Sequence, residues 1–325
     1  MDLSTTYLGM RLPHPLVVGA GPLGDDLDMV RALEDAGASL LVLRSLYEEE
    51  ITGEQIDAFN YVESYTDAFA EATNFEPEPT TIIGPDEYLE HLRRVKSAVS
   101  IPVMGSLNGV TPGGWISYAR QLEQAGADGI ELHIYHAASD ISLSASDVER
   151  QARDIVSEVK QSVRIPVAVK LAPLLTAFAH FAKQLDDSGA DGLVVFTRFH
   201  KADIDIEELN VVRSLSLSDS SELGMRLRGA AILSGRIKGS IGITGGVHTG
   251  VDVIKATMAG AHVTQMVSAL LRNGPGHLLK VRHDVESWMQ ENEWSSLNEM
   301  RGNMSLERIP DPAAFERANF RMALR

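Results

Sequence analysis

Short apolar segments alternate with amphipathic segments along most of the chain. Residues 16–21 form one apolar run, and a helical pattern over residues 27–36 follows it and ends at Gly37, a common helix stop. We expect Asp25 or Asp26 to cap this helix at its N-terminus. Nearly continuous apolar strands separated by amphipathic helices are typical of a parallel sheet that is covered by helices.

The strand–helix unit repeats through the sequence. A helix end, a glycine and a buried strand recur at 36–44, 125–133, 188–196 and 259–267, and an Ile-Pro-Val motif begins two more strands. The eight predicted strands begin near Leu16, Ser39, Ile101, Gly129, Pro166, Gly192, Ser240 and Ala261. This number favours an α/β fold of the (β/α)8 TIM-barrel type. An open doubly wound sheet is the alternative. The G-x-G-x-x-G spacing at 19–24 nevertheless contains Pro22 and precedes two aspartates, which argues against a dinucleotide-binding turn.

We expect residues 1–294 to form one barrel domain. Within it, residues 3–11 have the pattern of a small hairpin that would plug the bottom of the barrel. Residues 295–325 are expected to be a C-terminal arm and not an independent domain. The arm would pack on the barrel or on a neighbouring subunit, and we expect a homodimer.

One segment interrupts the regular spacing. Residues 46–85 contain ten acidic residues and no lysine or arginine. They follow the second strand, which places them at the mouth of the barrel, where long loops often carry function. The segment is either a lid or partner-docking surface, or a solvated helical excursion, which is the commoner meaning of a charge run.

Composition narrows the class of function. The net charge of −16 argues against nucleic-acid binding, which needs basic surfaces. The absence of cysteine excludes disulfides, cysteine-ligated clusters and a thiol nucleophile. No apolar run approaches a membrane span, and the N-terminus lacks the features of a secretory signal. We therefore expect a cytoplasmic protein with a small-molecule substrate, no nucleic-acid or membrane partner, and no metal site.

Two strand ends near the C-terminus have the features of a phosphate site. The strand that ends at Thr244 stops at Gly245-Gly246, and the next one ends at Val267 and Ser268. Bare backbone N–H groups that lead into helices bind phosphate, and the loops after the last two strands are the usual place in a (β/α)8 barrel. The alternative is that the glycine pair is an ordinary strand-to-helix turn.

Three side chains at other strand ends are candidates for chemistry. Lys170 ends an apolar strand. Three roles are open for it: a buried cation that holds an anion or an electron-rich ring, an amine that forms a Schiff base, or a lysine whose ammonium reaches solvent. His133 ends another strand and His136 follows it. A single histidine there is more often structural, but the pair favours proton transfer.

Seven motifs occur in order along the chain. They are Val17-Val-Gly-Ala-Gly21, Leu43-Arg-Ser45, Met104-Gly-Ser-Leu-Asn-Gly109, Ile130-Glu-Leu-His133, Pro166-Val-Ala-Val-Lys-Leu171, Ile243-Thr-Gly-Gly246 and Gln265-Met-Val-Ser-Ala-Leu270. Together they resemble the motifs of the dihydroorotate dehydrogenase family, whose members are FMN-binding barrels. The resemblance covers nearly the whole barrel and implies FMN as the cofactor.

The resemblance also implies roles for the cofactor side of the mouth. Gly245, Gly246, Val267 and Ser268 would hold the FMN phosphate, Ala20 and Gly21 would lie against the flavin ring, and Lys170 would contact its pyrimidine side. Ser45, Asn108, Thr197 and Thr244 complete the expected cofactor-binding set. A cation beside the ring would stabilise the negative charge of reduced flavin.

The substrate side departs from the family pattern. Arg44 stands where the family has a lysine, His133 where it has an orotate-binding asparagine, and His136 where it has the catalytic cysteine or serine base. We predict that His136 is the acid/base and that His133 and Arg44 orient the substrate. With Lys170 these residues form the predicted catalytic set.

The predicted function is an FMN-dependent oxidoreductase that acts on a C–C bond next to a carbonyl, in a dihydroorotate- or dihydropyrimidine-like compound. One alternative is a non-redox aldolase or isomerase barrel that uses Lys170. Another is a flavin-binding subunit of a larger redox complex. Because the chain has no cysteine to hold an iron–sulfur cluster, onward electron transfer needs a partner protein or a diffusible acceptor.

Overall fold

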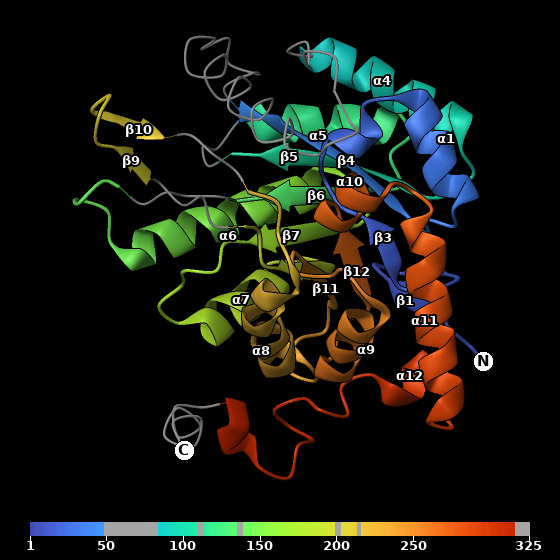
Figure 1. Cartoon of the computed structure of the whole chain (residues 1–325). Helices are drawn as coiled ribbons and strands as arrows, with labels where there is room; N and C mark the ends of the chain where they lie inside the picture. Colours follow the sequence, from blue (N-terminus) through green and yellow to red (C-terminus); the bar gives the residue numbers. More distant parts are fainter. Residues whose placement is uncertain (49–83, 110–113, 135–138, 199–202, 213–215, 316–325) are drawn as a thin grey trace.

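Eight parallel strands close into a barrel with helices packed around it (Figure 1). The computed structural model describes residues 1–48, 84–109, 114–134, 139–198, 203–212 and 216–315. The strands follow one another around the barrel in chain order, and the last pairs with the first. The predicted TIM barrel is confirmed, and each predicted strand start lies within two residues of the observed one.

The elements have the following bounds. The barrel strands are β3 (Leu16–Val18), β4 (Leu41–Tyr47), β5 (Val103–Asn108), β6 (Gly129–His133), β7 (Val167–Leu171), β8 (Gly192–Val195), β11 (Ser240–Thr244) and β12 (Val263–Met266). The helices are α1 (Leu27–Asp35), α4 (Pro85–Ala98), α5 (Gly114–Gln124), α6 (Ala145–Ser162), α7 (Phe178–Asp187), α8 (Leu223–Leu233), α9 (Gly250–Ala259), α10 (Ser268–Asn273), α11 (His277–Glu291) and α12 (Leu297–Met300). Two hairpins, β1 (Thr5–Tyr7) with β2 (Met10–Leu12) and β9 (Asp203–Asp205) with β10 (Asn210–Val212), lie outside the barrel sheet. Short 3-10 helices are η1 (Pro22–Gly24), η2 (Ser220–Glu222) and η3 (Pro312–Phe315).

Two sequence predictions need adjustment. The first barrel strand ends at Val18 and not at Gly21, and the chain enters the 3-10 helix η1 at Pro22. The acidic segment is shorter than 46–85, since β4 continues to Tyr47 and α4 begins at Pro85. Residues 49–83 lie outside the described residues, so both interpretations of this segment stay predictions.

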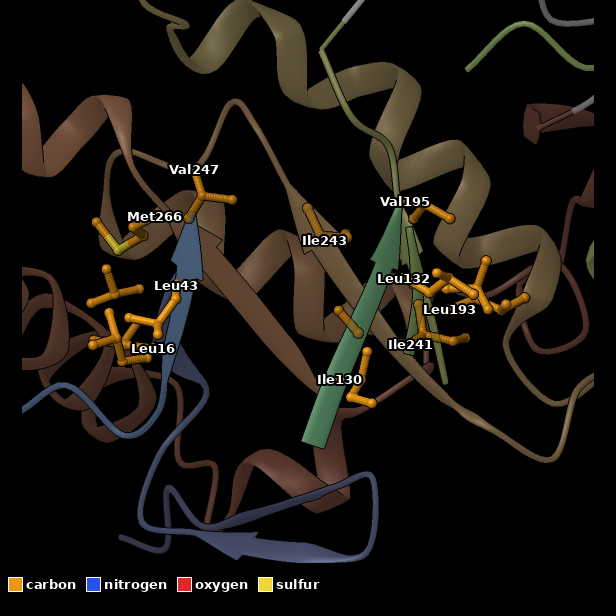
Figure 2. Packing of buried hydrophobic residues seen from close by; sticks show 14 of the residues in the cluster. Leu16, Leu43, Ile130, Leu132, Leu193, Val195, Ile241, Ile243, Val247 and Met266 are labelled. Atoms are coloured by element: carbon orange, nitrogen blue, oxygen red, sulfur yellow. The ribbon is translucent and has the colours of Figure 1, made fainter. Parts of the chain in front are cut away.

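The main hydrophobic core lies between the barrel wall and the helices. Figure 2 shows strand residues of this layer, among them Leu16, Ile130 and Leu193, which belong to the same buried cluster as Val30 of α1 and Leu92 of α4. Successive side chains of a strand point to opposite faces of the sheet. The residues between these outward-facing positions therefore point into the barrel.

The interior of the barrel is apolar at its bottom and polar toward its mouth. A second cluster joins the hairpin residues Tyr7, Leu8 and Leu12 to the inward positions Val17, Val42, Met104, Ala168, Val194 and Val263. The N-terminal hairpin thus closes the bottom, as predicted. Farther along the strands, the inward positions are Ser106, Lys170 and Gln265, and a bulge in β4 after Val42 pairs Ser45 with Ser106. The alternation that fills the bottom with apolar side chains therefore delivers polar ones to the mouth.

The C-terminal arm runs across the ends of two helices. Backbone N–H groups of Gly302 and Met304 donate to the carbonyls of Thr257 and Met258 in α9, at 3.0 and 2.9 Å. The N–H of Leu306 donates to a carbonyl of α8, that of Ala231, at 3.0 Å. The last carbonyls of a helix have no partner within the helix, so the arm completes these two ends.

Candidate active site

The glycine pair after β11 forms a tight backbone turn. Gly245 and Gly246 have φ values of 81° and 78°, in the left-handed region. A Cβ on Gly245 would lie 2.7 Å from the guanidinium of Arg226, and one on Gly246 would lie 2.6 Å from the backbone nitrogen of Leu223. Only glycine fits both the conformation and the space. The short helix α10 begins at the neighbouring strand end, in the position where barrels of this type bind phosphate.

Ser218 ties the two halves of this turn together. Its N–H donates to Ser268 Oγ at 3.1 Å, and its own Oγ lies 3.1 Å from His248 Nε2. Gly246 N–H also points at Ser218 Oγ, at 3.5 Å. Arg272 holds the same loop from behind by donating to the Ser218 carbonyl at 2.7 Å. We call Ser218, Gly245, Gly246 and Ser268 the cradle. The sequence analysis did not identify Ser218, because it is one of several serines in its loop.

A buried guanidinium lies beneath the cradle. Arg226 Nε donates to the Thr244 carbonyl at 2.6 Å, and Nη1 donates to the Glu222 carbonyl at 2.7 Å. The Glu222 carboxylate is 3.5 Å from the guanidinium. Burial lowers the pKa of Arg226, and nearby Arg198 lowers it further, while Glu222 raises it. A positive group beside a glycine turn suits an anion such as a phosphate.

The residues after the first barrel strand lie against the end of β12, next to the cradle. A Cβ on Gly19 would lie 3.0 Å from Gln265 Cβ, and one on Gly21 would lie 2.9 Å from a methyl group of Val267. Ala20 lies between the two glycines and packs against the barrel-interior cluster. The structure therefore brings Gly21 beside Val267, and the small residues Gly19, Ala20 and Gly21 form this strand end.

Lys170 ends β7 in contact with a buried carboxylate. Its Nζ lies 3.0 Å from Glu131 Oε1, and Gln265 Nε2 donates to the other carboxylate oxygen. Glu131 is 0% exposed and Lys170 7%. The hydroxyl of Tyr7 lies below them, and its pKa is raised by burial and then by the charge of Glu131. The sequence placed Glu131 on a strand that leads to the mouth, but its partners on β7 and β12 become evident only in the structure.

His133 lies beside Lys170 in the strand register. Asn108 of β5 pairs with His133 of β6, which pairs with Lys170 of β7. Burial, and then the Lys170 charge, lower the pKa of His133 to about 3. The imidazole is therefore neutral near neutral pH, which favours an orienting role over proton transfer. His136 lies outside the described residues, so its role as the acid/base stays a prediction.

The remaining candidates lie at the ends of β4, β8 and β11. Arg44 Nε is 3.6 Å from Asp25 Oδ1, while Asp26 caps α1, so the two candidate cap residues have separate roles. Ser45 Oγ and Ser106 Oγ are 2.7 Å apart. Two threonines are the other candidates here. Thr197 is half-buried and its N–H donates to the Leu171 carbonyl, and Thr244 is buried.

Within the described part of the chain, no group of three or more histidine, aspartate and glutamate side chains is arranged to hold a metal ion.

The sequence as a whole matches a known family. The family model for dihydroorotate dehydrogenase matches residues 2–289. The chain belongs to the dihydroorotate dehydrogenase family.

Individual relatives are distant. The chain is 25% identical over 305 residues to the dihydroorotate dehydrogenase B (NAD(+)) catalytic subunit of Thermoplasma acidophilum, covering 93% of this chain and 98% of the relative. It is 26% identical over 309 residues to the protein of the same name from Methanocaldococcus jannaschii, covering 89% and 94%. It is also 20% identical over 339 residues to the chloroplastic dihydropyrimidine dehydrogenase (NADP(+)) of Arabidopsis thaliana, covering 93% and 76%. The family is a family of oxidoreductases, and no helix among the described residues is long and apolar enough to cross a membrane.

Proposed function

We propose that this chain is an FMN-dependent oxidoreductase that acts on a C–C bond next to a carbonyl in a dihydroorotate- or dihydropyrimidine-like compound. The observation that carries the proposal is the cradle, where two glycines with left-handed φ values admit no side chain and lie beside the buried guanidinium of Arg226. The family match and the dihydropyrimidine dehydrogenase among the relatives support this substrate class.

The residues present fit FMN at the predicted positions. The cradle, with Val267, would hold the phosphate, and the flavin ring would lie against Ala20 and Gly21. Asn108, Ser45, Thr197 and Thr244 remain proposed contacts from the other strand ends. When bound, FMN supplies the acceptor for hydride from the substrate carbon.

The protein supplies orientation, charge and proton transfer. Arg44 and neutral His133 would hold the substrate carbonyl and ring nitrogens, and His136 would accept the proton that leaves with the hydride. Lys170 would act as a cation. The ion pair with Glu131 supports this over a Schiff-base role, because an amine must be neutral to attack a carbonyl.

Electrons have to leave the chain after each turnover. Several relatives are named as catalytic subunits of NAD(+)-dependent enzymes, and this chain has no cysteine for an iron–sulfur cluster. We therefore propose an electron-transfer partner protein or a diffusible acceptor. A homodimer and a cytoplasmic location belong to the same proposal.

The test begins with the purified protein. It should be yellow and should release FMN, and not FAD or pyridoxal phosphate, on denaturation. After reduction with dithionite, a panel of cyclic enones and pyrimidines would identify the substrate class by the compound that reoxidises it. A colourless protein that takes up no added FMN would contradict the proposal, and borohydride trapping of a carbonyl compound on Lys170 would favour the aldolase alternative.

A further inference from the structure

A fully buried carboxylate lies directly behind the lysine of the mouth. Glu131 is 0% exposed, and both of its oxygens are engaged, one by Lys170 Nζ at 3.0 Å and the other by Gln265 Nε2. A carboxylate in this position is costly unless a cation and hydrogen bonds compensate it. In the described part of the chain, Lys170 is the basic residue that forms an ion pair with it. The predicted catalytic set does not include Glu131.

The register of the strands shows which charge a ligand meets first. Glu131 pairs with Ala168, and Lys170 lies two residues farther along β7 toward the mouth. A group bound in the mouth therefore lies closer to the ammonium, with the carboxylate behind it. The two charges sum to zero. Because opposite unit charges a few ångströms apart partly cancel in the protein interior, the mouth attracts a negative ligand less than a lone lysine would.

We propose that Glu131 is a positioning residue that offsets the charge of Lys170 and thereby sets the redox potential of a flavin bound in the mouth. The reduced flavin carries a negative charge that the oxidised form lacks, so the carboxylate lowers the preference for the reduced form. This inference rests on the proposed function, since it requires FMN to bind beside Lys170.

The decisive variant is Glu131→Gln. Glutamine keeps the shape and keeps an oxygen for Lys170, but it removes the negative charge. The affinity for reduced FMN relative to oxidised FMN should rise about ten- to hundredfold, which corresponds to a midpoint potential about 30–60 mV higher. The measurement is a redox titration of the purified, FMN-loaded protein against reference dyes. A residue that only supported packing would change FMN content or stability without raising the potential.

The other end of the same strand offers a matched control. Asp191 Oδ2 lies 2.6 Å from Lys160 Nζ and accepts from the N–H of Val167, at the start of β7. Asp191→Asn removes a carboxylate from a lysine pair in the same way, but at the bottom of the barrel. Its midpoint potential should equal that of the wild type.

A second variant keeps the inference testable if Glu131→Gln does not fold. Glu131→Met has a similar length and carries no charge, so its potential should also exceed that of the wild type. A potential at or below the wild-type value with FMN bound, in either variant, would overturn the inference. A wild-type protein that binds no FMN would instead remove the proposed function, and this is seen before any variant is compared.

Discussion

The two sides of the barrel mouth are built from different materials. At the ends of β11 and β12, the cradle is backbone, shaped by Gly245 and Gly246 and tied together by Ser218. At the ends of β4 and β6, the surface consists of side chains, those of Arg44 and His133. A backbone cradle depends on the fold itself, whereas side chains can be exchanged without changing it. This difference agrees with the interpretation of the sequence, in which the motifs that resemble the family's cofactor site are kept and the expected substrate positions depart from the family.

The largest expected effect falls on the side-chain half. His136→Ala should slow reduction of the bound flavin by substrate roughly 10²–10⁴-fold, the usual contribution of a general base, while FMN content stays normal. Oxidation by the wild type should fall at acid pH near ~6.5, because imidazolium cannot accept a proton. Stopped-flow absorbance of the flavin measures both effects. Wild-type speed with an unchanged pH profile would show that the base lies elsewhere.

The next largest effect falls on the backbone half. Gly246→Ala places a Cβ 2.6 Å from the Leu223 nitrogen at a φ of 78°. The clash would displace the turn from the position that holds the phosphate, so FMN affinity should fall roughly ten- to hundredfold, measured by quenching of flavin fluorescence. Gly274→Ala is the control, since Gly274 has a φ of 74° and nothing within 4 Å of an added Cβ. Equal FMN affinity in the two variants would mean that the cradle does not hold the phosphate.

Two buried histidines at the bottom of the barrel make the stability of the fold depend on pH. Burial, followed by nearby Arg282 and Arg301 respectively, lowers the pKa of His14 and His262 to about 4. The unfolded chain protonates these histidines near ~6.5, so it binds protons that the folded chain refuses. Stability is therefore complete above that pH and is lost as the pH falls from about 6.5 toward 4.

Between these two pH values, each histidine should lower the ratio of folded to unfolded protein by about tenfold for every pH unit. Urea unfolding at several pH values measures it. His262→Asn keeps an acceptor for the N–H of Ile241, which now donates to His262 Nδ1 at 3.0 Å, and it should reduce the pH dependence. A variant with the wild-type slope would show that His262 is not responsible.

The smallest expected effect separates the two histidines of the mouth. His133→Asn should raise the KM of the substrate several-fold, roughly the value of one hydrogen bond, and leave flavin reduction at saturation nearly unchanged. Because burial and Lys170 already hold the pKa of His133 at about 3, its removal should not shift the pH profile near neutrality. Steady-state kinetics at two pH values test this, and a shifted profile would make His133 the titrating group.

The barrel and its glycine turn could be predicted because both follow from local rules. Apolar runs at regular spacing gave the strands, and a glycine pair at a strand end indicated the cradle. The partners of Glu131 could not be predicted, because Gln265 is 134 residues away and meets it only when β12 curves back beside β3. Ser218 was missed for the same reason, since its loop has no pattern and gains its role from contacts with Ser268 and His248.

The arm described above also bears on how the protein is made. The N–H of Asp2 donates to the Ser295 carbonyl at 3.0 Å, and the N–H of Leu297 donates to the Asp2 carbonyl at 3.0 Å. Two segments that are far apart in the sequence are thus fastened to each other. Since the same arm completes the ends of α8 and α9, a nascent chain has to hold nearly all of its strands before either fastening exists. Closure of the ring requires β12, which pairs with both β11 and β3, so a chain that stopped before β12 would display the open edge of its sheet.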